Sequence, residues 1–157
     1  MRGLVIYESA YGNTESVART IAGSLEKHGS ITLVHAADAR AINVHDSDFL
    51  IIGSPTQLHK ASPTVNEWLD GLPFDSLRNF PVATFDTRYQ MPAWRSGSAA
   101  RLLAKRVQRL GAILVIPPES FFVTRNEGNL IPGELERAPV WADNLYKKYL
   151  DFISTKS

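Results

Sequence analysis

A change of hydrophobic period within the first 25 residues constrains the fold of this chain more than any other feature. Residues 4–7, Leu-Val-Ile-Tyr, form a continuous apolar and aromatic run that is typical of a buried strand. A helix is predicted from Asn13 to His28, and its apolar side chains recur at helical spacing: Val17, Ala18, Ile21, Ala22 and Leu25. A strand that leads directly into a helix is the building unit of α/β folds with a parallel sheet.

The residues between this strand and this helix predict a phosphate-binding loop. Ser9 to Thr14 reads Ser-Ala-Tyr-Gly-Asn-Thr and contains no Lys or Arg. The start of the helix would present unpaired backbone N–H groups and the positive end of its dipole. Ser9, Asn13 and Thr14 add side-chain donors, and Gly12 lets the backbone approach an anion closely. The alternative is an ordinary turn in which Asn13 or Thr14 caps the helix.

Other phosphate motifs and several chemistries are excluded by what the sequence lacks. The loop has neither the Gly-x-Gly-x-x-Gly pattern of dinucleotide sites nor the Gly-Lys-Ser/Thr of nucleoside triphosphate loops. The chain has no cysteine, which excludes disulfides, thiol nucleophiles and cysteine-ligated metals. The four histidines show no paired metal-ligand spacing, so no metal site is predicted.

Length and charge predict an ordinary globular protein. The 157 residues are most simply one domain, and the net charge of +1 gives no reason to expect nucleic acid or a membrane surface as a partner. No apolar run approaches the roughly 20 residues of a membrane-spanning helix. The chain begins directly with a predicted strand, without the pattern of a signal peptide, so a cytoplasmic location is expected.

The rest of the chain alternates strand-like and helix-like segments. Phe49 to Ile52 is an apolar run of the kind found in central parallel strands, and further strands are predicted at residues 31–35, 81–85 and 113–116. Further helices are predicted from Ser62, over 97–110 and over 136–153, with one helical turn near 39–44 and a turn-rich segment from 117 to 133. Gly29 and Gly111 are expected to end helices in left-handed caps. This alternation predicts a doubly wound five-stranded parallel sheet in the order 2-1-3-4-5.

In that strand order three loops surround one crevice. The first and third strands are neighbours at the switch point, where ligands bind in open α/β sheets. Their carboxyl ends carry the Ser9–Thr14 loop and the segment Gly53-Ser54-Pro55-Thr56. A long loop predicted from Asp86 to Ser96 follows the fourth strand and opens on the same edge. The convergence favours the phosphate-binding interpretation over an ordinary turn.

With these motifs in this order, the chain resembles the flavodoxin family over nearly its whole length. Residues 9–14 resemble the family's loop for the phosphate of flavin mononucleotide (FMN), usually Ser/Thr-x-x-Gly-Asn/Thr-Thr. Residues 53–56 resemble its second loop, which lies against the isoalloxazine ring, and residues 86–96 occupy the place of its third loop. Residues 133–138, with Trp141-Ala142, are similar to the family's entry into the last helix. No long insertion interrupts the last strand, as in the short-chain group.

The resemblance implies an FMN-binding electron-transfer protein. Its partners would be redox proteins or a small redox substrate, and the chain would be a monomer or a weak homo-oligomer. No catalytic residue is predicted. The residues expected to contact the cofactor are Ser9, Ala10, Tyr11, Gly12, Asn13, Thr14, Ser54, Pro55, Thr56, Gln57, Leu58, Asp86, Thr87, Arg88, Tyr89 and Trp94.

Two departures from the family pattern keep a second hypothesis open. No aromatic residue matches the family's flavin-flanking positions, and Tyr89, Met91 and Trp94 are the alternatives in the third loop. Arg88 and Arg95 lie where flavodoxins tend to be acidic. The second hypothesis is therefore a flavodoxin-like flavin enzyme, a quinone or nitro-compound reductase or an oxidase, whose basic loop attracts an anionic substrate or a pyridine-nucleotide phosphate.

The sequence also offers simpler interpretations of single residues and two other classes of protein. A surface ion pair is the alternative for Asp86 and Arg88, and His59 is a candidate for cofactor contact only because it follows the second loop. A receiver domain would need an acidic cluster after the first strand, where only Glu8 stands. A hydrolase would need a Gly-x-Ser-x-Gly turn, which the chain lacks around Ser9.

Overall fold

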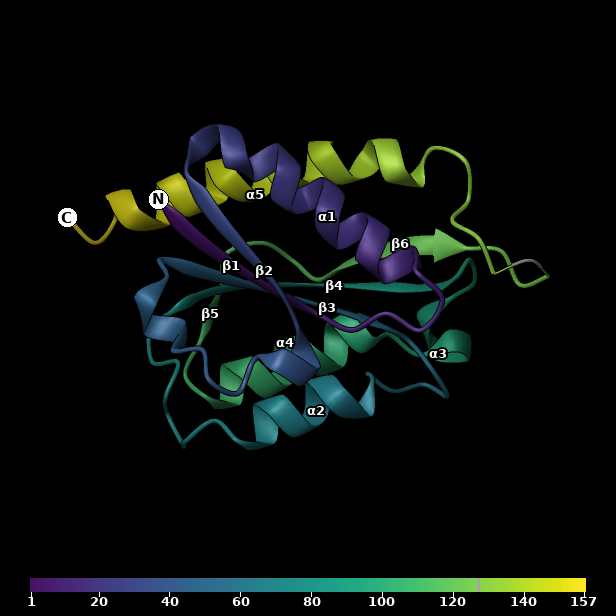
Figure 1. The fold of residues 1–157 in the computed structure, drawn as a ribbon, viewed down its shortest axis with the longest axis horizontal. Coiled ribbons are helices and arrows are strands. Elements are labelled where there is room, and N and C mark those ends of the chain that lie inside the picture. Colours follow the sequence, from purple (N-terminus) through teal and green to yellow (C-terminus); the bar gives the residue numbers. More distant parts are fainter. Residues whose placement is uncertain (127) are drawn as a thin grey trace.

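The computed structural model describes residues 1–126 and 128–157. A parallel sheet runs through the middle of the molecule in the predicted order, β2-β1-β3-β4-β5 (Figure 1). A further strand, β6, pairs with β4 beyond the end of β5. The strands are β1 Arg2–Tyr7, β2 Ser30–His35, β3 Phe49–Pro55, β4 Pro81–Tyr89, β5 Ile113–Leu114 and β6 Glu119–Val123.

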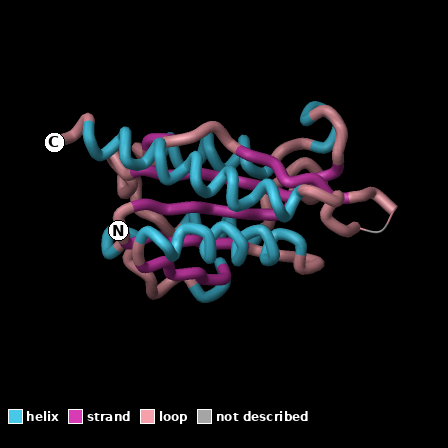
Figure 2. The backbone as a smooth tube through the Cα atoms, turned by 90° about the horizontal axis from the view of Figure 1, so that it is seen from above, coloured by secondary structure: helices cyan, strands magenta, loops and turns pink. Residues whose placement is uncertain are grey.

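Helices cover both faces of this sheet. In Figure 1, α1 (Asn13–Leu25) and α5 (Glu134–Ser154) lie above the sheet, whereas α2 (Pro63–Asp70) and α4 (Ala99–Arg109) lie below it. Figure 2 shows α1 and α5 side by side, in agreement with their contacts. The short helix α3 (Ala93–Ser96) lies at the end where β6 finishes. In the described ranges, 3-10 turns lie at Glu26–His28, Ala36–Asp38 and Val44–Asp46.

The central strand β3 divides the core into two halves. All of its residues are buried, as the apolar run predicts. Because successive side chains of a strand point to opposite faces, Leu50 and Ile52 pack with the side chains of α2 and α4, and Phe49 and Ile51 pack with those of α1 and α5. Both faces of the sheet are thereby sealed, and ligand access is left to its edges and ends.

The fourth strand is longer than the sequence predicts, and the fifth is divided. β4 continues to Tyr89 because β6 pairs with its second half, from Phe85 opposite Glu119 to Tyr89 opposite Val123. Pro117-Pro118 separates β5 from β6, since proline cannot donate to a strand ladder. The prediction of a loop beginning at Asp86 is therefore wrong. The predicted turn-rich segment 117–133 contains β6, and residue 127 within it lies outside the described residues.

Smaller differences concern how helices begin and end. The α-helical part of the first helix stops at Leu25, and a 3-10 turn carries the chain to His28. Gly29 is extended (φ 161°) rather than left-handed, so its predicted cap is wrong, whereas Gly111 is left-handed (φ 95°) as predicted. Ser62 and Pro63 begin α2 as predicted, with the Ser62 hydroxyl accepting the Val65 N–H. The helical turn expected near 39–44 is replaced by 3-10 turns on either side of it.

Candidate functional site

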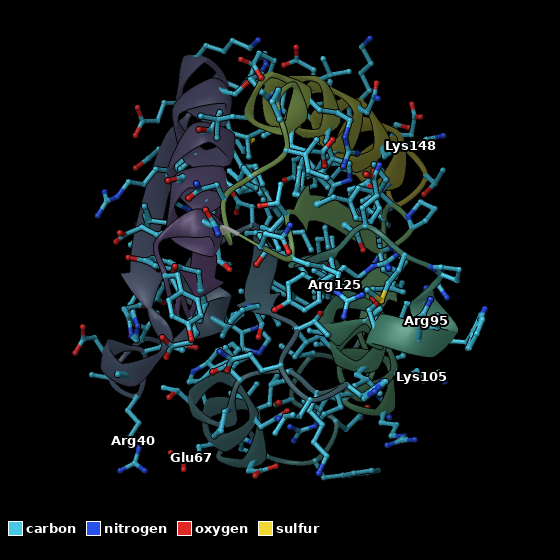
Figure 3. The ribbon with its side chains drawn as sticks, turned by 90° about the vertical axis from the view of Figure 1, so that its right-hand side faces the viewer. Arg40, Glu67, Arg95, Lys105, Arg125 and Lys148 are labelled. Atoms are coloured by element: carbon cyan, nitrogen blue, oxygen red, sulfur yellow. The ribbon has the colours of Figure 1, made fainter. Side chains whose placement is uncertain are left out.

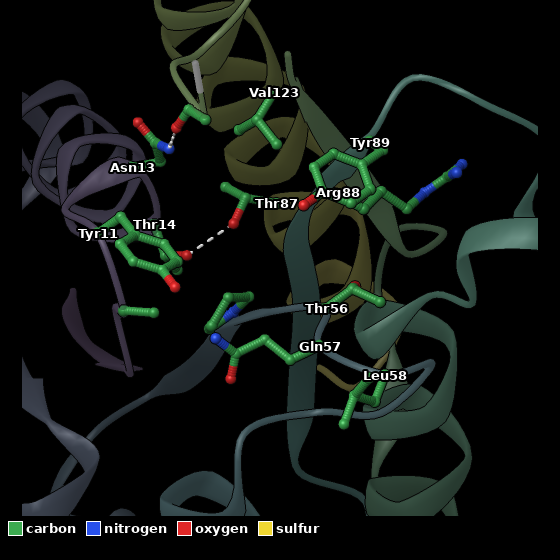
Figure 4. A pocket seen from close by; sticks show the side chains of 13 residues that line it. Tyr11, Asn13, Thr14, Thr56, Gln57, Leu58, Thr87, Arg88, Tyr89 and Val123 are labelled. Atoms are coloured by element: carbon green, nitrogen blue, oxygen red, sulfur yellow. Dashed lines mark hydrogen bonds between the residues drawn. The ribbon is translucent and has the colours of Figure 1, made fainter. Parts of the chain in front are cut away.

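A cavity of about 330 Å³ lies at the carboxyl ends of β1, β3 and β4 (Figure 4). That volume falls in the range of small-molecule sites. Most of the residues predicted to bind a cofactor line it, together with two that were not predicted. The lining residues are Ala10, Tyr11, Asn13, Thr14, Pro55, Thr56, Gln57, Leu58, Thr87, Arg88, Tyr89, Val123 and Gly128.

The first loop leaves the start of α1 open toward this cavity. Gly12 is the N-cap residue, in a left-handed conformation (φ 91°) that favours glycine, and it has no side chain to accept the first N–H groups of the helix. The N-cap is thus Gly12 rather than Asn13 or Thr14, so the cap residue that the alternative of an ordinary turn predicts is wrong. Among the residues that the structure describes, no acceptor bonds the backbone N–H groups of Tyr11, Asn13 and Thr14. These donors, with the dipole of α1, suit an anion.

Side chains of the same loop fix its shape. The Ser9 hydroxyl accepts the N–H groups of Gly12 (3.0 Å) and Glu15 (3.3 Å), so Ser9 holds the loop and does not line the cavity. Thr14 is buried, and its hydroxyl lies 2.8 Å from that of Thr87 on β4. The Asn13 amide donates to the carbonyl of Gly128 (Figure 4). These two contacts join the first loop to β4 and to the segment after β6.

Carboxylates next to the loop are already engaged. Glu15 accepts a hydrogen bond from the Tyr7 hydroxyl (2.8 Å), and this bond together with Arg19 lowers the pKa of the Glu15 carboxyl. Glu8 accepts the N–H of Ser9 and a ring N–H of His35. Neither carboxylate lines the cavity. An anion at the start of α1 would therefore meet neutral donors rather than a cation or a free carboxylate.

The second loop is shaped from inside by Ser54. This residue is fully buried, and its hydroxyl donates to the Pro55 carbonyl and accepts the Ser62 N–H at the start of α2. Ser54 thus stands behind the cavity wall rather than in it, whereas Pro55 and Thr56 line the cavity. The Thr56 hydroxyl also accepts the Ala99 N–H at the start of α4 (2.9 Å).

A tight turn follows at the cavity edge. The backbones of Gln57 and Lys60 exchange two hydrogen bonds of 2.9 Å, and both residues between them, Leu58 and His59, have positive φ (48° and 66°). Such turns favour Asn and Gly, so Leu and His here carry local strain. Leu58 is 90% exposed while lining the cavity, which gives the mouth an apolar rim.

Asp86 does not reach the cavity, in contrast to the prediction. It is fully buried in β4, where Oδ2 accepts the Ser98 hydroxyl (2.6 Å) and the Ala100 N–H (3.0 Å). The hydroxyl of Thr84, two residues earlier, donates to the Ala100 carbonyl, so this side of β4 faces α4. Burial raises the pKa of the Asp86 carboxyl. The predicted place of Asp86 at the start of a loop is wrong because β4 continues beyond Phe85.

Arg88 forms a fixed cationic wall. It is 9% exposed and lies 4.0 Å from Asp86 (Nε to Oδ1), so the predicted alternative of a surface ion pair does not hold. Its Nη1 donates to the Met91 carbonyl (2.7 Å) and the Ser96 hydroxyl (3.0 Å), and Nε donates to the Ser120 hydroxyl (2.8 Å). Its position is thus set by β4, β6 and the segment around α3.

Comparison with known proteins gives the chain its family. A sequence model described as Flavodoxin domain matches residues 4–109, which include the first two loops and β4. The chain belongs to the flavodoxin family. Curated protein sequences give no match.

Solved structures share the fold of this flavodoxin. Flavodoxin 2 from Bacillus cereus is 22% identical, with a TM-score of 0.78 over 94% of this chain and 99% of that one. Flavodoxin 1 from the same organism is 21% identical, with a TM-score of 0.77 over 94% and 98%. The flavodiiron protein from Giardia intestinalis is 18% identical, with a TM-score of 0.77 over 99% of this chain and 38% of its own.

Other predicted residues of this flavodoxin lie outside the cavity. Trp94, on α3, is 81% exposed and does not line it, and Gly12 shapes the loop without lining it. His59 lines the neighbouring hollow rather than this cavity. In the described part of the chain, no group of three or more His, Asp or Glu side chains is arranged to hold a metal ion. No helix within the described ranges has the length and apolarity needed to cross a membrane.

Val123 and Gly128 line the cavity but are not among the residues predicted from the sequence. Val123 ends β6 and Gly128 follows it, so both depend on a strand that lies where the sequence predicts turns. The run Glu119 to Val123, with three apolar residues after Ser120, was an available signal for that strand.

Proposed function

We propose that this flavodoxin binds one FMN noncovalently in the 330 Å³ cavity and transfers electrons to redox partner proteins. The observation that carries the proposal lies at the start of α1: Tyr11, Asn13 and Thr14, whose N–H groups bond no acceptor in the described part of the chain, line the same cavity as apolar and aromatic residues from three other segments. Bound FMN would supply the redox chemistry, since the chain has no cysteine.

The lining residues would divide into phosphate and ring contacts. The N–H groups of Tyr11, Asn13 and Thr14 would hold the phosphate, with the Thr14 hydroxyl as a further donor. Tyr11 and Tyr89 stand on opposite sides of the cavity in Figure 4, and planar side chains there suit a planar ring. The exposed Leu58 would shield the ring at the mouth.

We expect saturating FMN to raise the thermal midpoint of the purified protein. A ligand that binds only the native state at 100 times its Kd stabilises it by about 2.7 kcal/mol. For a chain of this size that amounts to roughly 5–11 °C. Differential scanning calorimetry with and without FMN measures the shift. An unchanged midpoint, with unquenched flavin fluorescence on titration, would contradict the proposal.

Replacing Thr14 with Val is expected to weaken FMN binding by about 1–3 kcal/mol, the cost of leaving a buried acceptor without its donor. Riboflavin lacks the phosphate and should bind the wild type and the variant about equally. Fluorescence titration with both flavins makes the comparison.

The matched control for this substitution is Thr87→Val, which removes the other hydroxyl of the same 2.8 Å contact. If the Thr14 hydroxyl serves only to hydrogen-bond Thr87 on β4, the two variants lose the same FMN affinity. A greater loss in Thr14→Val, confined to FMN, is expected for a phosphate donor.

A second candidate function, a flavin enzyme, is favoured by the arginine side chains beside the cavity. Stepwise photoreduction separates the two candidates, because a one-electron carrier should accumulate one-electron-reduced flavin with its long-wavelength absorption. Rapid two-electron bleaching by reduced nicotinamide cofactor, with turnover on quinones, would instead establish the enzyme. We expect the long-wavelength band.

A further inference from the structure

A second hollow, of about 300 Å³, adjoins the cofactor cavity on the side of α3. The two share Thr56, Leu58, Arg88 and Tyr89 as a common wall. A molecule in the hollow would therefore lie directly beside a molecule in the cavity. The second hollow is lined in addition by His59, Met91, Arg95, Ser96 and Arg125.

The charged side chains that line the second hollow are all positive. Arg88 on β4, Arg95 on α3 and Arg125 after β6 line it, and none of its lining residues within the described chain is Asp or Glu. Figure 3 shows Arg95 and Arg125 on the same side of the molecule, far from Arg40. Arg88 is paired with the buried Asp86, but no carboxylate in the described lining balances the charges of Arg95 and Arg125, so an anion in the hollow would be favoured.

The three arginines differ in their bonding partners and in their exposure to solvent. Arg88 is fixed by its bonds to Met91, Ser96 and Ser120. Arg95 is exposed, and no carboxylate in the described part of the chain forms an ion pair with it. Arg125 lies over the Tyr89 ring, with 6.0 Å between its guanidinium carbon and the ring centroid. The hollow is thus lined by one guanidinium that is bonded into the fold and by two that are exposed to solvent.

Apolar groups complete the lining. Leu58, Met91 and the Tyr89 ring lie among the cations, so the hollow suits a ligand with an apolar body and a charged end. Guanidinium groups bind carboxylates and phosphates through paired hydrogen bonds. The concave form and small volume suit a small molecule better than an acidic protein surface.

We propose that this hollow binds a small organic anion, with a carboxylate or phosphate group and an apolar body, next to the flavin. The inference rests on the proposed binding of FMN in the adjoining cavity. It gives the second candidate function a substrate class, because an anion held there would contact the same wall as the cofactor.

Titration of the FMN-loaded protein with three probes at constant ionic strength tests the proposal. Benzoate and phenyl phosphate carry the two possible oxyanions, and benzamide is the neutral counterpart of benzoate. We expect saturable changes in flavin absorption with at least one anion, and binding of benzamide at least tenfold weaker. The tighter of the two anions identifies the group that the arginines recognise.

Single substitutions assign the binding to this hollow. Arg95→Gln and Arg125→Gln should each weaken binding of the better anion at least fivefold, whereas Arg40→Gln, an equal charge change on the opposite side, should not. Arg88 is left intact because it is bonded into the fold. Equal affinity for benzamide, an equal loss in Arg40→Gln, or no saturable binding of either anion would overturn the inference, the last in favour of an acidic protein partner.

The experiments distinguish a failure of FMN binding from a failure of anion binding. If FMN itself does not bind, calorimetric titration of the flavin-free protein with the same anions decides the inference. Binding that depends on Arg95 and Arg125 supports the anion site, and no binding overturns it. If FMN binds with unaltered affinity in all variants while neither anion does, the inference alone is wrong.

Discussion

Replacing Gly53 with Ala is expected to lower the free energy of unfolding by about 3 kcal/mol or more, the upper end for overpacking a core. A Cβ atom at Gly53 would lie 2.1 Å from Cζ of Phe85, its partner across the β3–β4 ladder. The Phe85 ring cannot move away easily, because it is fully buried against Phe121 and Trp141. Urea unfolding at pH 7 measures the loss.

Two further variants test whether the loss comes from the contact between residues 53 and 85. Gly23 lies exposed in α1, where an added Cβ meets nothing within 4 Å, so Gly23→Ala should raise stability by about 0.5–1 kcal/mol. Combining Gly53→Ala with Phe85→Leu should recover part of the loss by removing the aromatic ring from the contact. A Gly53→Ala protein as stable as the wild type would show that β3 and β4 are not packed as described.

Arg88→Met is expected to cost about 3–5 kcal/mol at pH 7, the usual penalty for removing one member of a buried charge pair. The substitution leaves the Asp86 carboxylate fully buried without the guanidinium 4.0 Å away. It also removes the bonds that join β4 to Met91, Ser96 and Ser120. Arg95→Met, an equal change on an exposed side chain, should stay within about 0.5 kcal/mol of the wild type.

The pH dependence of this loss has a definite sign. Burial raises the pKa of Asp86 in the folded protein above the roughly 3.9 of an unfolded chain. A raised carboxyl pKa favours folding at pH values below 3.9, and that advantage is lost as the pH rises through the folded pKa. Without Arg88 the folded pKa should rise further, so the destabilisation in Arg88→Met should shrink as the pH falls from 7 toward 4.

The double variant Asp86→Asn with Arg88→Met isolates the charge pair. It removes the buried charge together with its partner, so it should be more stable at pH 7 than Arg88→Met alone. If Arg88→Met costs no more than Arg95→Met, or if its cost is independent of pH, the charge pair does not stabilise the fold.

The sequence alone determined the strand order and the first two loops of this flavodoxin. The apolar run at Phe49–Ile52, the strand-to-helix change before Asn13 and the alternation of periods are local patterns, and right-handed crossovers allow few sheets from them. The loops at residues 9–14 and 53–58 follow directly from those strands. Their backbone positions were therefore predictable from neighbours within a few residues.

Only the tertiary structure decided which residues of β4 and β6 line the cavity. β4 extends to Tyr89 because β6, more than 30 residues later, pairs with it, and this pairing buries Asp86 against α4 while Thr87 faces the cavity. It also brings Val123 and Arg125 to the site. Residues 86–89, Asp-Thr-Arg-Tyr, have no strong local signal for a strand, because the stability of this part of β4 comes from hydrogen bonds and packing that form only when the sheet is assembled.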